Sequence, residues 1–114
     1  MQEKIYDLQP LNALVDGNDK FRQYLIELFI QTTPPILEDL KNSLLINDLE
    51  GVYAHTHKVK PTLDSLGMFS LRPIVEGIMK QVKTKNKDNT LENLVETLCH
   101  KVTLAIEQLQ LNEL

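Results

Sequence analysis

The fold class is decided first by residues 90–114, which read TLENLVETLCHKVTLAIEQLQLNEL. Apolar side chains recur here every three or four residues, which is the spacing of one face of an α-helix. The members of this stripe are Leu91, Leu94, Val95, Leu98, Val102, Ile106 and Leu109. The stretch therefore predicts an amphipathic helix of about five turns that ends the chain.

The segments before this helix repeat the same period. Residues 83–89 are polar and predict a loop, and Ser70 is placed to cap a helix that ends at that loop. The inward residues of this helix are Leu71, Ile74, Val75, Ile78 and Val82. Residues 47–50 have a capping-box-like spacing, so a further helix is predicted to start there and to end at Gly67.

Two more helical segments are predicted in the N-terminal part of the chain. A short one contains Leu8, Leu11, Leu14 and Val15, and a longer one has its stripe at Phe21, Tyr24, Leu25, Leu28 and Phe29. Thr33 and Pro34 can cap and begin a new helix, so we expect a kink or a break there. Beyond this point the inward residues are Leu37, Leu40, Leu44 and Leu45.

No stretch alternates apolar and polar residues as a strand does, so the predicted fold class is all-α. Four substantial helices with short connections favour an antiparallel four-helix bundle, with a short extra helix at the N-terminus. A chain of 114 residues suffices for one domain, and we assign residues 1–114 to a single domain. The composition, 42% hydrophobic and 25% charged, is typical of a compact soluble protein.

Charge and composition argue against several classes of function. The net charge is −4 and the cations are scattered apart from a short run at residues 83–87, so we expect no nucleic-acid partner. The N-terminus lacks an apolar signal core and no stretch approaches the ~20 apolar residues of a membrane span, so we expect a cytoplasmic protein without membrane contact. Cys99 is the single cysteine, which excludes an intramolecular disulfide and a Cys-rich zinc site.

The chemistry concentrates in residues 54–67, AHTHKVKPTLDSLG. On a helical wheel one apolar face contains Val52, His55, Val59, Leu63 and Leu66. His57 lies about 150° from the centre of that face and is expected to be exposed. A neutral imidazole is a nucleophile, and the ammonium of Lys60 at i+3 can offset charge on a transferring phosphoryl group.

This segment resembles the motif of histidine phosphotransfer (HPt) domains. In that motif the phosphorylated histidine is followed by an apolar residue at +2, lysine at +3, a small residue at +4 and Leu-Gly at +9 and +10. The matching residues are His57, Val59, Lys60, Leu66 and Gly67. The pattern of helices before and after the motif is similar to that of the family across nearly the whole chain.

The resemblance implies a phosphorelay function with a specific set of residues. His57 would be the phosphoacceptor and Lys60 the charge stabiliser, while the receiver-docking surface would comprise the exposed side chains of Lys58, Pro61, Asp64 and Met68. The partners would be a response-regulator receiver domain, which brings its own Mg²⁺, and a hybrid histidine kinase. The chain itself would need no cofactor, would have no kinase activity of its own, and is expected to be a monomer.

A competing register starts from His55, because Ala54-His55-Thr56 is similar to the usual opening of the family motif and would make Lys58 the +3 lysine. This register places His57 at the apolar +2 position and Ser65 where glycine is expected. It also puts the nucleophile on the apolar face. We therefore favour His57 and expect His55 to be a core-edge residue that is hydrogen-bonded within the bundle.

Pro61 stands where the family usually has glycine. Within a helix, proline removes the hydrogen bond to the carbonyl of His57, so we expect the helix to bend there. The alternative is that Pro61 marks a helix boundary and His57 lies in a loop, because the residue before a proline disfavours the α conformation.

Other functions have less support. His55 and His57 are two residues apart and point to different faces, as do the adjacent Cys99 and His100, so we expect no metal site. There is no Gly-rich phosphate loop. The main rival is a helical module that binds a receiver without phosphotransfer, which Pro61 and Asp64 favour, and an independent enzyme is the least supported reading. The presence of Met1 and a complete set of helices favours a free-standing protein.

Overall fold

The computed structural model describes residues 3–84 and 89–114. Within these ranges the chain forms five α-helices and one 3₁₀ helix, and it has no strand, so the predicted all-α class is confirmed. The α-helices are α1 (Gln9–Val15), α2 (Asp19–Leu45), α3 (Leu49–Ser65), α4 (Arg72–Thr84) and α5 (Asn89–Glu113), and the 3₁₀ helix is η1 (Phe69–Leu71).

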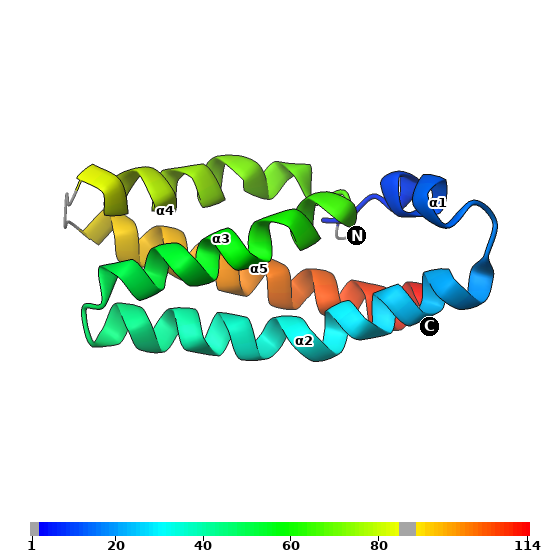
Figure 1. Cartoon of the computed structure of the whole chain (residues 1–114), viewed down its shortest axis with the longest axis horizontal. Coiled ribbons are helices and arrows are strands. Elements are labelled where there is room, and N and C mark those ends of the chain that lie inside the picture. The colour runs from blue at the N-terminus through cyan, green and yellow to red at the C-terminus, as the bar shows by residue number, and fades with distance from the viewer. Residues whose placement is uncertain (1–2, 85–88) are drawn as a thin grey trace.

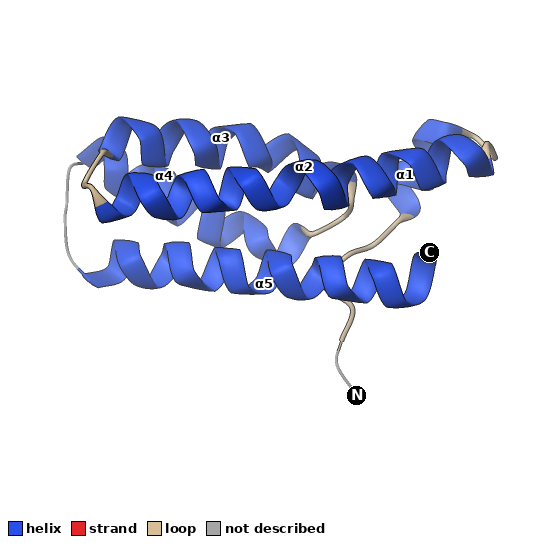
Figure 2. Cartoon of the chain, turned by 90° about the horizontal axis from the view of Figure 1, so that it is seen from below, coloured by secondary structure: helices blue, strands red, loops and turns tan. Residues whose placement is uncertain are grey.

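The long helices lie side by side and successive helices run in opposite directions (Figure 1). Helix α2 packs against α3 and α5, and α4 also packs against α3 and α5, while α1 packs on α2. The molecule is elongated, with extents of 45 × 28 × 20 Å. The view from below shows the N-terminal part of α2 extending with α1 beyond the ends of α3 and α4 (Figure 2).

Helix α5 follows the prediction from its apolar spacing. Six of the seven stripe residues are buried, and Leu94 is half-buried. The helix has 25 residues, which is about seven turns and longer than expected. Its apolar stripe faces the other long helices, and residues from all five α-helices join it in one core.

The break that was expected at Thr33 and Pro34 is absent from helix α2. The helix is continuous through Pro34 and Pro35, and Thr33 is buried inside it rather than capping a new helix. The ribbon changes direction in its cyan middle part, so the kink is present without the break (Figure 1). Both prolines are exposed, where carbonyl oxygens that lose a helical donor can bond to water.

The N-terminal half of α2 also differs from the predicted packing. Its core-facing residues are Ile26 and Phe29, whereas Phe21, Tyr24 and Leu28 are exposed. Both sides of this segment carry apolar residues, so the sequence pattern does not identify which side packs inward. Leu45 at the end of α2 was also expected inside and is exposed, and Leu14 of α1 is exposed as well.

The connections around α4 differ in detail from the prediction. Ser70 lies within the 3₁₀ helix and does not cap α4, which begins at Arg72 with Pro73 in its first turn. Of the residues 83–89 that were predicted as a loop, Lys83 and Thr84 belong to α4 and Asn89 begins α5. Residues 85–88 lie outside the described ranges.

In the described part of the chain, no helix combines the length and the apolar character that a membrane crossing requires.

Candidate functional site

Helix α3 carries both candidate histidines and has well-defined ends. At its start, the Asp48 carboxylate accepts a hydrogen bond of 3.0 Å from the Gly51 amide, which satisfies a free N–H of the first turn. At its end, Gly67 has a positive φ of 68° and its amide donates to the Asp64 carbonyl. Since the helix runs through Pro61 to Ser65, the alternative that Pro61 is a helix boundary is wrong. His57 therefore lies inside a helix.

The buried face of α3 is centred on Thr56 rather than on His55. The fully buried residues are Val52, Thr56 and Val59, and the Thr56 hydroxyl donates to the Val52 carbonyl at 2.8 Å. His55 is half-buried at the edge of this face, as expected. The structure gives His55 no hydrogen bond to any described residue, so the hydrogen-bonded role is not found.

His57 is exposed, as the helical wheel predicted, and its ring has an aromatic neighbour. The ring of Tyr53, one turn earlier on α3, stacks on the His57 ring with centroids 6.2 Å apart and planes 14° apart. The Lys83 ammonium nitrogen of α4 lies 5.7 Å from the centroid of the same tyrosine ring. The three side chains form what we call the His57 array: His57, Tyr53 and Lys83.

An open, mostly basic groove lies between α3 and α4 beside this array. It has a volume of about 380 Å³ and is lined by Lys60, Glu76, Met79, Lys80, Lys83 and Thr84. Lys60 is half-buried and lies at i+3 from His57 on α3, while Lys83 belongs both to the groove and to the His57 array. Three ammonium groups against one carboxylate give the groove a positive potential that suits an anionic phosphoryl group.

Sequence reasoning missed Tyr53 and Lys83. Tyr53 could have been found from its position four residues before His57, because side chains at i and i+4 meet on a helix surface. Lys83 is far from His57 in the sequence, and only the packing of α4 against α3 brings it to the array. No local pattern identifies such a residue.

The four predicted docking residues do not share one environment. Lys58 and Pro61 are exposed on α3, whereas Asp64 is half-buried and accepts a 3.0 Å hydrogen bond from Arg72 Nε of α4. Met68 is fully buried, so the expectation that it is exposed is wrong. The chain reverses at Gly67 and directs the Met68 side chain into the core.

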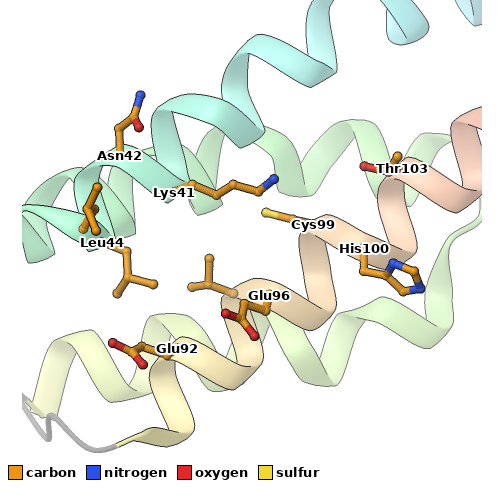
Figure 3. A pocket seen from close by; sticks show the side chains of 10 residues that line it. Lys41, Asn42, Leu44, Glu92, Glu96, Cys99, His100 and Thr103 are labelled. Carbon is orange, nitrogen blue, oxygen red and sulfur yellow. The ribbon is translucent and has the colours of Figure 1, made fainter.

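A second pocket lies away from His57, between the C-terminal part of α2 and the N-terminal part of α5 (Figure 3). It has a volume of about 720 Å³, and among its lining residues are Lys41, Glu96, Cys99 and His100. Cys99 is buried, and burial raises the pKa of its thiol, while the Lys41 charge opposes this shift. The His100 ring points away from the Cys99 sulfur, so the two side chains diverge as predicted (Figure 3).

No group of three or more His, Cys, Asp or Glu side chains in the described ranges is arranged to hold a metal ion. No protein-family model, no curated protein and no solved structure matches this chain. A function for the chain must therefore follow from its own residues and their geometry.

Proposed function

We propose that this chain is a histidine phosphotransfer protein that relays a phosphoryl group between receiver-domain aspartates through His57. The observation that carries the proposal is an exposed His57 in an uninterrupted helix, with Tyr53 against its ring and a groove lined by lysines from α3 and α4 beside that tyrosine. The HPt-like arrangement, an antiparallel four-helix bundle of α2 to α5 with α1 as the extra helix, belongs to the same proposal.

The reaction requires little from this chain beyond a positioned nucleophile. The unprotonated ring nitrogen of His57 attacks the phosphorus of a receiver aspartyl phosphate in line with the leaving carboxylate. The P–N bond forms as the P–O bond to the aspartate breaks, and the other ring nitrogen loses its proton to water. The second transfer reverses these steps toward another receiver aspartate. The Mg²⁺ that supports both steps belongs to the receiver.

Lys60 and Lys83 are the charge stabilisers in this proposal. Negative charge spreads over the phosphoryl oxygens in the transition state, and the ammonium groups of the groove between α3 and α4 can offset it. Lys60 follows from the sequence motif, whereas Lys83 is added by the contact of its ammonium with the Tyr53 ring. An exposed lysine contributes modestly, so we expect losses of about tenfold or less from each.

The docking surface in the proposal keeps Lys58, Pro61 and Asp64 and omits the buried Met68. The acidic side chain of Asp64 supported the rival reading, because a free carboxylate on the same face as His57 would repel a phosphorylated partner. Its ion pair with Arg72 offsets this charge and favours the relay. The partners proposed are a receiver domain and a hybrid histidine kinase, and the compartment proposed is the cytoplasm.

The decisive experiment is phosphoryl transfer from a phosphorylated receiver domain to the purified protein. We expect acid-labile, base-stable phosphate on wild type, on His55→Gln and on His100→Gln, and none on His57→Gln. Lys83→Met should slow the transfer, whereas Lys101→Met, an exposed lysine on α5, should not. Unlabelled wild type that still binds the receiver would instead establish the non-catalytic module.

A further inference from the structure

An exposed apolar row lies on the N-terminal half of α2. Phe21, Tyr24 and Leu28 are 44%, 57% and 39% exposed, and their spacing places them on one side of the helix. The rings of Phe21 and Tyr24 stack with centroids 6.4 Å apart. The opposite side, with Ile26 and Phe29, is buried in the core. A helix that is apolar on both sides is typical of a helix that is covered on both sides.

The described chain does not cover this row. Arg22 shows where the neighbouring segments lie, because its guanidinium donates to Asn12 of α1 at 2.8 Å and to Glu113 of α5 at 3.0 Å. Arg22 is half-buried by these contacts, whereas the three row residues stay exposed. The row is therefore free for another molecule.

The charged side chains beside the row indicate which molecule covers it. Lys20 and Glu27 are exposed and lie seven residues apart, which places them along the same edge of the helix. Neither has an ion-pair partner among residues 3–84 and 89–114. One edge of the row thus has a cation near one end and an anion near the other, and such an edge is complementary to itself in the antiparallel direction.

We propose that a second copy of this chain covers the row, with the two α2 helices antiparallel about a two-fold axis near Tyr24. Phe21 of one copy then lies near Leu28 of the other, and Lys20 of each copy lies opposite Glu27 of the other. A parallel arrangement would bring like charges together on this edge. The dimer replaces the monomer expected from the sequence and does not depend on phosphotransfer.

Three partly exposed side chains per copy cover less than the roughly 800 Å² per partner of a stable interface. The dimer is therefore expected to be weak and transient. Such a dimer forms and separates with protein concentration, which makes it measurable by sedimentation equilibrium.

The test is sedimentation equilibrium of the full chain from about 5 µM to about 1 mM. Wild type should dimerise, and Tyr24→Glu should raise the dissociation constant about tenfold or more. The control is Leu45→Glu, which changes an exposed apolar residue at the other end of α2 and should leave the dissociation constant unchanged. Circular dichroism confirms that each variant is folded.

Charge-reversal variants test whether the two α2 helices are antiparallel in the dimer. Lys20→Glu and Glu27→Lys should each weaken self-association several-fold, because each places like charges across the axis. An equimolar mixture of the two variants should dimerise at least as well as wild type, since all its facing pairs are of opposite charge.

A wild type that is monomeric throughout the concentration range would overturn the proposal. Equal effects of Tyr24→Glu and Leu45→Glu would overturn it too, because the interface would then lie elsewhere. If wild type is monomeric and Tyr24→Glu instead loses binding to a receiver domain, the row belongs to the receiver and the second copy is excluded. Phosphate labelling of wild-type His57 does not require that the chain dimerise, so the dimer and the relay fail separately.

Discussion

Among single residues, Tyr53 has the most direct influence on the proposed chemistry. Its ring lies against the His57 ring on the same helix, and it also contacts the Lys83 ammonium. An exposed imidazole without such a neighbour samples several rotamers, and only some of them present a ring nitrogen to a partner. We regard Tyr53 as a positioning residue.

Tyr53→Leu should lower the rate of phosphoryl transfer to His57 by about twofold to tenfold, which corresponds to the ~0.5–1.5 kcal/mol of an aromatic pair. Tyr53→Phe retains the ring and should transfer at nearly the wild-type rate. Single-turnover transfer from a phosphorylated receiver measures both. If Tyr53→Phe is as slow as Tyr53→Leu, the phenol hydroxyl and not the stacked ring is the important group.

The backbone conformation and the surroundings of Gly67 explain why this residue is glycine. Its φ of 68° lies in the left-handed region, and a Cβ there would overlap the backbone carbonyl of Asp7. The Asp7 amide donates to the Leu66 carbonyl at 3.0 Å, which holds the N-terminal segment against this turn. Any side chain at Gly67 must therefore displace that segment.

Gly67→Ala should lower the free energy of unfolding by about 2 kcal/mol or more, because the conformational cost and the overlap add. Gly17→Ala is a matched control, since Gly17 has a φ of 83° but no atom near its Cβ position. It should lose only the conformational part, about 1–2 kcal/mol. Urea denaturation of the two variants measures the difference, and equal losses would contradict the close approach of Asp7.

At the scale of the helix, the effect of Pro61 on the free energy of unfolding can be measured. It lies inside α3 and cannot donate to the His57 carbonyl. Pro61→Ala restores that donor, so the free energy of unfolding should rise by about 1–3 kcal/mol, against the ~3 kcal/mol that an interior proline costs. Thermal or urea denaturation provides the measurement. A variant no more stable than wild type would mean that α3 is already relaxed around the proline.

The elements also show how far the sequence determines the structure. Apolar spacing identified α5 and the exposed position of His57, because periodicity reports directly on which side of a helix is buried. It failed for Phe21 and Tyr24, where both sides of α2 are apolar and only the packing of α1 and α5 decides. The resemblance, rather than the spacing, gave the wrong exposure for Met68, whose direction depends on the reversal at Gly67. Lys83 joins His57 only through tertiary packing.

Across the whole molecule, the two ends of the chain are joined through α5. The Gln108 amide bridges the N-terminal segment, accepting from the Ile5 N–H at 3.0 Å and donating to the Glu3 carbonyl at 2.8 Å. Nearer the C-terminus, Glu113 accepts hydrogen bonds from the Tyr6 hydroxyl at 2.8 Å and from Arg22 Nη2 at 3.0 Å. One carboxylate thus connects the N-terminal segment, α2 and α5.

Burial alone would raise the pKa of Glu113, but the hydrogen bonds from Tyr6 and Arg22, with the charges of Arg22 and Lys4, hold that pKa below its ordinary value. A carboxyl whose pKa is lower in the folded state stabilises the fold at pH values above its unfolded pKa. This stabilisation is lost as the pH falls through the folded pKa, because between the two pKa values the unfolded chain binds more protons than the folded one and falling pH favours unfolding.

Glu113→Gln should therefore have a lower free energy of unfolding than wild type at pH 7. The difference between the two proteins should become smaller as the pH falls from about 5 to about 3. Glu107→Gln, an exposed position on α5, should show a smaller gap with little dependence on pH. Urea denaturation of the three proteins across this range tests the expectation. If the difference in free energy of unfolding between Glu113→Gln and wild type stays constant with pH, the substitution acts through packing or hydrogen-bond geometry and not through charge. The ends of the chain would then not be joined by an ionised carboxylate.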